Sequence, residues 1–271
     1  MLASQVNQLE IIDKILLRYI FDAHPKTGIE WLYSDAGKLN LGSLMQIRRL
    51  MYLWHILSRG ENELIRRVYT TQKLSSNTGD WIGLVEQDKQ QLGIDMSDHE
   101  IQGVSKEMFK RYVSKKVKNN FLKYLNDIKS KHSKSSNLKC DEIKTAEYLL
   151  SPKFSLKEKI LLFKLRSRTL DIKGNFKKQY KDSWCISCGL FEETQKHLLQ
   201  CPEIVSKLNY LAGSATNLDE NDIYEGVDKQ EKIIKVYSDI LEIREELKMK
   251  KIEENFTLSD MGGPNAHVTV L

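Results

Sequence analysis

Three cysteines and one histidine lie within seventeen residues of this 271-residue chain, in the order Cys185, Cys188, His197 and Cys201. Three thiolates and one imidazole form a ligand set typical of a closed tetrahedral Zn²⁺ site, and they leave no position for a water molecule. The set therefore predicts a structural zinc knuckle rather than a catalytic metal. The alternatives are reduced buried cysteines, or a disulfide pair beside an unrelated histidine.

The residues around the four ligands suit such a knuckle. The first two cysteines are three residues apart, which is typical of one tight turn, and Gly189 after them can take the positive φ that such turns often need. The last two ligands are four residues apart, a spacing that places both on one face of a helix. Because Pro202 disfavours helical geometry at the residue before it, that helix should end or bend at Cys201. Cys140 stands alone and is expected to be a buried or free thiol.

The pattern of apolar residues predicts a mainly α fold. The chain has only four prolines, and its apolar residues recur at spacings of three and four. Ser97 and Ser155 each have the form of a capping box that begins a helix. We expect helices over residues 6–20, 44–58, 62–73, 80–91, 105–129, 160–170, 203–211 and 228–253. The expected architecture is a bundle-like helical region, followed by a small CCHC zinc knuckle and a C-terminal helix.

The same pattern suggests four segments. A helical region spans residues 1–132, and a basic helical segment with the zinc knuckle spans 133–213. An amphipathic helix follows over 214–254, and a disordered tail over 255–271. The Ser- and Lys-rich stretch at 131–136 is the expected linker. No apolar run approaches the roughly 20 residues that cross a bilayer, so we expect no membrane contact and an intracellular location, nuclear or cytoplasmic, where thiols stay reduced.

The positive charge is concentrated ahead of the knuckle. Residues 106–139 carry 11 Lys and Arg against 2 Asp and Glu, and residues 153–181 carry 10 against 2, which is half of the 42 Lys and Arg in the chain. Residues 202–271 are acidic, with 8 against 14. Such focusing is typical of a surface that binds a polyanion.

The two basic segments supply the candidate nucleic-acid contacts. The first offers Lys110, Arg111, Lys115 and Lys118, and the second offers Lys164, Arg166, Arg168, Lys173, Lys177, Lys178 and Lys181. The alternative for the first is a solvated helix face. In the second, three aromatic residues alternate with the cations, and their four-residue spacing favours packing over stacking on bases. These are Phe176, Tyr180 and Trp184.

Catalytic signatures are missing from the sequence. It contains no adjacent pair of aspartates of the kind that holds two metals in a polymerase palm, no Walker phosphate loop, and no proline followed by aspartate. We therefore expect no catalysis by this chain. An alternative to nucleic-acid binding is a structural or protein-interaction module, with the acidic helix at 228–253 as the docking surface.

Several segments resemble a known family in their order. They are residues 30–33 (EWLY), 47–53 (IRRLMYL), 63–65 (ELI), 79–81 (GDW), 161–168 (LLFKLRSR), 173–176 (KGNF) and the cysteine–histidine motif. Over about residues 1–201 the chain resembles the region that follows the polymerase domain in the reverse transcriptase of non-LTR retrotransposons.

That resemblance implies a role but no activity. The family's full-length protein copies element RNA into DNA at a cut target, and its post-polymerase region, with thumb-like and linker helices and a zinc knuckle, is thought to hold template RNA or target DNA. Only Cys185, Cys188, His197 and Cys201 carry over from the family. Fingers, palm and catalytic aspartates have no counterpart, so we expect a truncated or separately encoded C-terminal piece. RNA or DNA would be its partner, with a polymerase-bearing retroelement protein as a further candidate.

Overall fold

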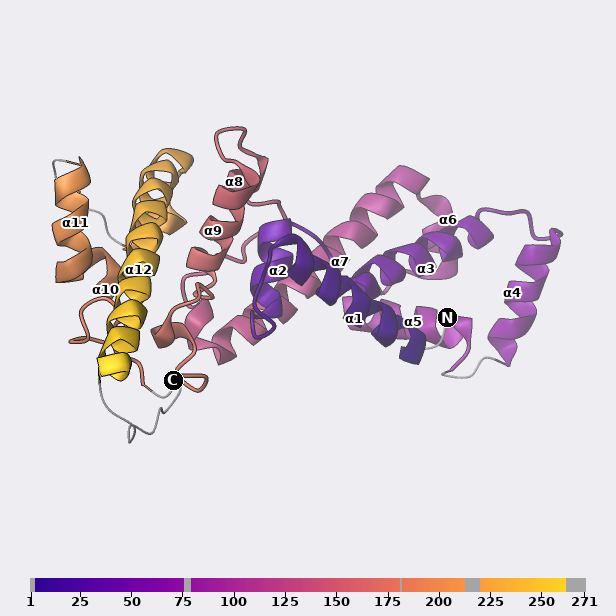
Figure 1. The fold of residues 1–271 in the computed structure, drawn as a ribbon. Helices are drawn as coiled ribbons and strands as arrows, with labels where there is room; N and C mark the ends of the chain where they lie inside the picture. Colours follow the sequence, from indigo (N-terminus) through magenta and orange to yellow (C-terminus); the bar gives the residue numbers. More distant parts are fainter. Residues whose placement is uncertain (1–2, 76–78, 181, 213–219, 262–271) are drawn as a thin grey trace. The chain divides into compact units, whose positions relative to one another are not determined.

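The structure is mainly α-helical, as the apolar spacing predicts. The computed structural model describes residues 3–75, 79–180, 182–212 and 220–261. These ranges contain twelve α-helices and one isolated β-bridge, between Trp184 and Glu192, and no strand (Figure 1). The chain divides into two compact units, residues 1–146 and 147–271.

The first unit is built around the pair α3 and α7. Its helices are α1 (Ala3–Ile20), α2 (Ile29–Ala36), α3 (Leu41–Leu57), α4 (Leu64–Leu74), α5 (Trp81–Leu92), α6 (Asp98–Gly103) and α7 (Lys106–Lys131), followed by the 3₁₀ turn η1 (Ser133–Ser135). The helix α7 buries Phe109, Val113, Val117, Phe121 and Leu125, an apolar stripe at four-residue spacing. It packs along α3, while α1 and α5 also contact α3.

Local polar contacts fix where α6 begins. The capping box predicted at Ser97 is present: its hydroxyl accepts from the Glu100 N–H, and the Glu100 carboxylate accepts from the Ser97 N–H at 2.7 Å. Next to it, Tyr69 and Lys73 of α4 both donate to Asp98, at 2.9 and 2.7 Å. Burial acts to raise the pKa of Asp98, but these two hydrogen bonds outweigh it, and the pKa is lowered.

The stretch that looked like a linker is part of the first unit. Ser135 is buried and donates to the carboxylate of Glu30, which is completely buried on α2. Further along, the Ala146 N–H donates to the Asp35 carbonyl at 2.9 Å. The chain after α7 thus runs back along α2, so the boundary expected after His132 lies inside the first unit. The helix α2 itself was not expected, because it is short and is buried on most of its sides, which leaves no periodic pattern to read.

The second unit is organised by its last helix. Its elements are α8 (Glu147–Leu150), α9 (Leu156–Arg166), η2 (Lys173–Asn175), α10 (Gln195–Gln200), α11 (Pro202–Ala212), η3 (Glu220–Tyr224) and α12 (Val227–Met261). α12 contacts α8, α9, α10, α11 and η3. Its apolar side, which includes Ile233, Tyr237 and Ile240, is completely buried there.

Two expectations for the second unit differ from the structure. α12 is an integral part of this unit and continues past residue 254 to Met261, into the stretch expected to be a disordered tail. Residues 262–271 lie outside the described part. The helix expected over 160–170 begins at the capping box predicted at Ser155, but it ends at Arg166 rather than at Leu170, because Arg168 has a positive φ of 52°. None of the described helices is both long and apolar enough to cross a membrane.

Candidate metal centre

The four predicted ligands come together in one cluster that could hold a metal ion such as zinc. The ligand atoms of Cys185, Cys188, His197 and Cys201 all lie within 4.8 Å of one another. Sγ of Cys185 is 3.8 Å from Sγ of Cys201, and Sγ of Cys188 is 3.4 Å from Nε2 of His197. A regular Zn²⁺ tetrahedron, with bonds of about 2.3 Å to sulfur and about 2.0 Å to nitrogen, has S–S edges of about 3.8 Å and S–N edges of about 3.5 Å. These two separations match the edges of such a tetrahedron, and three sulfurs with one imidazole nitrogen are the donor set of a closed zinc site.

A short turn holds the first two cysteines. The Gly189 N–H donates to the Cys185 carbonyl at 2.8 Å, and the Cys185 N–H donates to the Phe191 carbonyl at 2.7 Å. Gly189 has a φ of 70°, as the sequence predicts. The Leu190 N–H points to Sγ of Cys188 at 3.5 Å, a contact that stabilises a thiolate. The turn thus presents both sulfurs on one side.

The short helix α10 supplies the other two ligands. Its N-cap is Thr194, whose hydroxyl accepts from the His197 N–H at 3.0 Å. The helix ends at Cys201, which has extended geometry (φ −63°, ψ 121°) before Pro202, as predicted. The ring of Phe191 lies 5.4 Å from the ring of His197 and covers it from the turn.

Burial keeps most of the thiols protonated until a cation arrives. It raises the pKa of Cys185, and it raises the pKa of Cys201 to about 12. At Cys188 burial also acts upward, but hydrogen bonds from the backbone N–H groups of Leu190 and Phe191 outweigh it and lower the pKa. Burial lowers the pKa of His197, which favours the neutral imidazole that a metal needs. Zinc binding would therefore displace protons from the sulfurs, and its free energy would contribute to folding.

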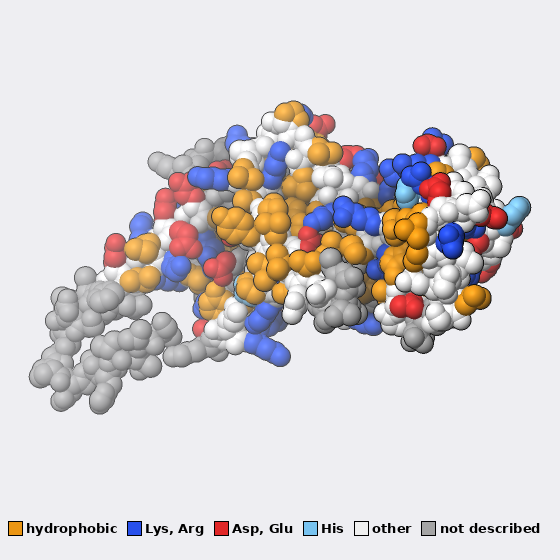
Figure 2. Space-filling view, turned by 90° about the vertical axis from the view of Figure 1, so that its right-hand side faces the viewer, with side chains coloured by type: hydrophobic (Ala, Val, Ile, Leu, Met, Phe, Trp, Pro, Cys, Tyr) orange, Lys and Arg blue, Asp and Glu red, His pale blue; other side chains and the backbone are white. Residues whose placement is uncertain are grey.

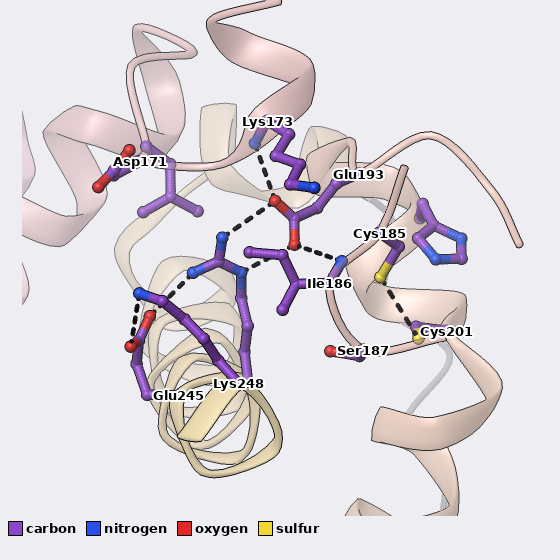
Figure 3. Close-up of polar contacts among 12 residues, drawn as sticks. Asp171, Lys173, Cys185, Ile186, Ser187, Glu193, Cys201, Glu245 and Lys248 are labelled. Atoms are coloured by element: carbon purple, nitrogen blue, oxygen red, sulfur yellow. Dashed lines mark hydrogen bonds and ion pairs between the residues drawn. The ribbon is translucent and has the colours of Figure 1, made fainter. Parts of the chain in front are cut away.

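A buried ion pair fastens the metal turn to α12. The carboxylate of Glu193, which is completely buried, accepts from Nε and Nη2 of Arg244 at 2.9 and 3.0 Å. It also accepts from the backbone N–H groups of Lys173 at 2.8 Å and Ile186 at 3.2 Å (Figure 3). Ile186 lies between the first two cysteines. We call these four hydrogen bonds the Glu193 clasp.

Two further contacts close the same junction. Lys251 of α12 donates to the carbonyls of Ile186 and Ser187, at 2.8 and 3.0 Å. The Gly174 N–H donates to the Glu193 carbonyl at 2.9 Å, and a Cβ at position 174 would come within 2.4 Å of that oxygen. The metal turn is thus in contact with both α12 and the chain around η2. The sequence did carry one signal for the clasp, since Arg244 falls at helical spacing in the apolar stripe of α12.

Cys140 has no part in the cluster. It lies in the first unit, where it is buried, and burial raises its pKa. Its carbonyl accepts a hydrogen bond from Asn126 of α7 at 3.1 Å. It is therefore the buried thiol that the sequence suggested.

The cations predicted in the first basic segment lie on the solvent side of α7. Lys110, Arg111, Lys115 and Lys118 are all exposed. None of them makes an ion pair with a residue that the structure describes. The apolar stripe of α7 lies on another side of the helix, where it is buried. The helix thus separates its apolar residues from these four charges.

The second basic segment is different, because several of its cations are already engaged. Arg166 lies over the rings of Tyr148 and Tyr224, at 5.3 and 5.6 Å from their centroids. Lys173 pairs with Asp182 at 2.8 Å, and Lys177 pairs with Glu192 at 2.6 Å. Lys164 and Arg168 are half-buried and are not free either, whereas Lys178 is exposed and Lys181 lies outside the described residues. Engaged and half-buried cations thus interrupt any binding face along this segment.

The aromatic residues of this segment do not form a helix face. Phe176 is buried and follows η2, Tyr180 is half-buried, and Trp184 is 55% exposed. Packing, which the spacing favoured for all three, therefore holds for Phe176 but not for Trp184.

Comparisons with known proteins identify no relative of the chain. A scan against family models, a search of curated proteins and a search of solved structures each gave no match. The resemblance to the retrotransposon family therefore stays a prediction.

Proposed function

We propose that this chain is a non-catalytic nucleic-acid-binding module, held together by a structural zinc ion, that binds RNA or DNA. The observation that carries the proposal is the solvent side of α7, where Lys110, Arg111, Lys115 and Lys118 are exposed without an acidic partner in the described chain. Elsewhere exposed lysines do find acids, as Lys153 does with Asp228. Cations left unpaired on one helix face are available to phosphates, and each contact gains free energy from released counterions.

The family resemblance supports the same function and gives it a setting. By that analogy the bound nucleic acid is template RNA or target DNA, and the polymerase belongs to a retroelement protein rather than to this chain. The location is then intracellular, in the nucleus or the cytoplasm. The zinc would keep the knuckle folded and take no part in chemistry, because its four ligand positions are filled by the protein.

Filter binding across a salt series tests the proposal. For a charge-driven complex, the logarithm of the binding constant falls linearly with the logarithm of the salt concentration. The triple variant Arg111→Gln, Lys115→Gln and Lys118→Gln should bind more weakly and should lose up to about 2.7 units of slope on duplex DNA, or about 2.1 on a single strand.

A control variant removes three positive charges from α12 instead of α7. Lys232, Lys235 and Lys250 are exposed on α12, and their triple change to Gln lowers the net charge equally. This control should keep most of the wild-type slope. Equal losses in the two triple variants, or no binding to any nucleic acid at low salt, would refute the proposal.

A docking module remains a second candidate, on a surface other than the one expected. The apolar side of α12 is buried in the second unit, so this helix offers little for a partner to cover. By contrast, α1 exposes Ile12, Ile15 and Tyr19 by 59%, 60% and 83%. Figure 2 shows several hydrophobic side chains next to one another on the face that it draws. Sedimentation at several concentrations tests this candidate, since Ile12→Lys with Ile15→Lys should abolish any self-association that α1 drives.

A further inference from the structure

Two adjoining hollows open on the first unit beside α7. The first, which we call the amide hollow, has a volume of about 350 Å³. Six side-chain amides line it, from α1, the start of α3, α5 and α7: Asn7, Asn40, Gln46, Gln87, Gln91 and Asn120. The second, the lysine hollow, has a volume of about 370 Å³ and is lined by Lys115, Lys116 and Lys123 with Tyr112 and Asn119. Gln91 and Asn120 border both hollows.

The amide hollow offers hydrogen-bonding groups that the protein does not use. Asn7, Gln87 and Asn120 make no side-chain hydrogen bond with the residues described. Gln46 donates to the Oε1 of Gln91 at 2.8 Å, which leaves the amide N–H groups of Gln91 available. An amide both donates and accepts, so the hollow can pair with a ligand edge of either kind.

The wall of the amide hollow carries no unbalanced charge. Arg49 and Asp88, which both line it, are joined by two hydrogen bonds at 2.6 and 2.9 Å. The lysine hollow is positively charged instead, because three ammonium groups border it and no acid does. One of them, Lys116, donates to the Gly93 carbonyl at 2.9 Å, while Lys115 and Lys123 are exposed. A neutral polar site thus adjoins a cationic one.

An aromatic ring lies at the edge of the amide hollow. Tyr124 lines it and is 43% exposed. One side of its ring stacks on Phe121, with centroids 5.9 Å apart and planes at 26°. Such a ring, held in place from one side, is a platform for a flat ligand on the other.

A nucleotide has the same two parts, a neutral base and an anionic phosphate. Asn and Gln amides pair with base edges, lysines pair with phosphates, and aromatic rings stack on bases. In a duplex the pairing edges of the bases are occupied, so only an unpaired base can enter such a hollow. We infer that the first unit binds single-stranded nucleic acid at this place, with an unpaired base in the amide hollow and the neighbouring phosphates at the lysines. This inference rests on the proposed function and adds that the bound nucleic acid is single-stranded.

Competition between strands tests the inference on the full zinc-loaded chain. A labelled 12-nucleotide single strand, made once as RNA and once as DNA, is compared with its own duplex at one salt concentration. The tighter binding of the two single strands shows whether the ligand is RNA or DNA. For that nucleic acid we expect the single strand to bind at least tenfold more tightly than its duplex. The double variant Gln91→Ala with Asn120→Ala should reduce this preference to near unity and leave the salt slope unchanged.

A neighbouring residue supplies the control. Gln90 is exposed on α5 next to Gln91 but lines neither hollow, so Gln90→Ala should keep the full preference. Circular dichroism checks that each variant keeps its helices, which Ala favours. Salt-dependent binding with equal affinity for strand and duplex, or a preference that survives the double variant, overturns the inference alone. No salt-dependent binding to either form overturns the proposed function as well.

Photo-crosslinking gives a second readout that does not depend on variants. A single strand that carries one 4-thio-pyrimidine should crosslink to a peptide containing Tyr124, because the base lies against that ring. Crosslinks confined to peptides outside α1, α3, α5 and α7 would contradict the proposed placement.

Discussion

Replacing Arg244 with leucine tests whether the Glu193 clasp holds the metal turn to α12. The side chains of Arg244 and Glu193 are 6% and 0% exposed, so water cannot replace the lost partner. Removing one member of a buried ion pair usually costs about 3–5 kcal/mol. Two backbone N–H groups would still contact the Glu193 carboxylate, and leucine keeps part of the packing. We therefore expect the lower end, about 3 kcal/mol, which is more than a hundredfold in the local opening equilibrium.

Hydrogen exchange followed by mass spectrometry measures this cost without assuming that both units unfold together. In Arg244→Leu, peptides from α10 and α12 should lose protection by about that factor, while peptides from the first unit should not change. Glu246→Ala is the matched control on the same helix, because Glu246 is 58% exposed and pairs with Lys207 at 3.4 Å. Its cost should stay below about 1 kcal/mol.

The second partner completes a double-mutant cycle. Glu193→Gln removes the buried charge, so adding Arg244→Leu to it should cost less than Arg244→Leu costs alone. Coupling between residues in contact is typically about 0.5–3 kcal/mol. Equal protection in Arg244→Leu and Glu246→Ala, or strict additivity in the cycle, would refute the role of the clasp.

Three further predictions concern single residues. Cys188→Ser should lose both the zinc and the exchange protection of residues 185–201, whereas Cys140→Ser should keep one zinc per chain in a reducing buffer; metal analysis decides between these outcomes. Gly174→Ala should lower the stability of the second unit by about 1–3 kcal/mol, because its Cβ would meet the Glu193 carbonyl at 2.4 Å; a wild-type urea midpoint would count against this. Asp98 has a lowered pKa, so its stabilising effect is present above pH about 4 and is lost as the pH falls through the folded-state value. As the pH is lowered from 7 to 3, the urea midpoint should therefore fall less steeply in Asp98→Asn than in the wild type. Parallel curves for the two proteins would contradict the stabilising role of the Asp98 carboxylate.

The ligand cluster could be predicted from sequence because it depends on short spacings. The turn before Gly189, the end of α10 before Pro202 and the capping boxes at Ser97 and Ser155 are all decided within a few residues. Local steric and hydrogen-bonding rules act at that range, and they hold whatever the rest of the chain does. The same is true of α7, whose stripe from Phe109 to Leu125 repeats without interruption.

The features that sequence did not supply depend on contacts between distant residues. Glu193 directly precedes the N-cap of α10, and only the approach of α12 makes it a buried partner of Arg244. Ser135 looked like part of a linker until α2 brought Glu30 to it. The cations of residues 153–181 were candidate nucleic-acid contacts, but acids and rings elsewhere in the second unit engage several of them, including Arg166.

X-ray absorption at the zinc K-edge tests the central claim of a closed structural metal site most directly. The purified chain, prepared under reducing conditions, should contain one zinc per molecule. Its spectrum should fit three sulfur neighbours at about 2.3 Å and one nitrogen at about 2.0–2.1 Å. A chain without zinc, or a spectrum that requires an oxygen ligand in place of one of these four, would contradict the account.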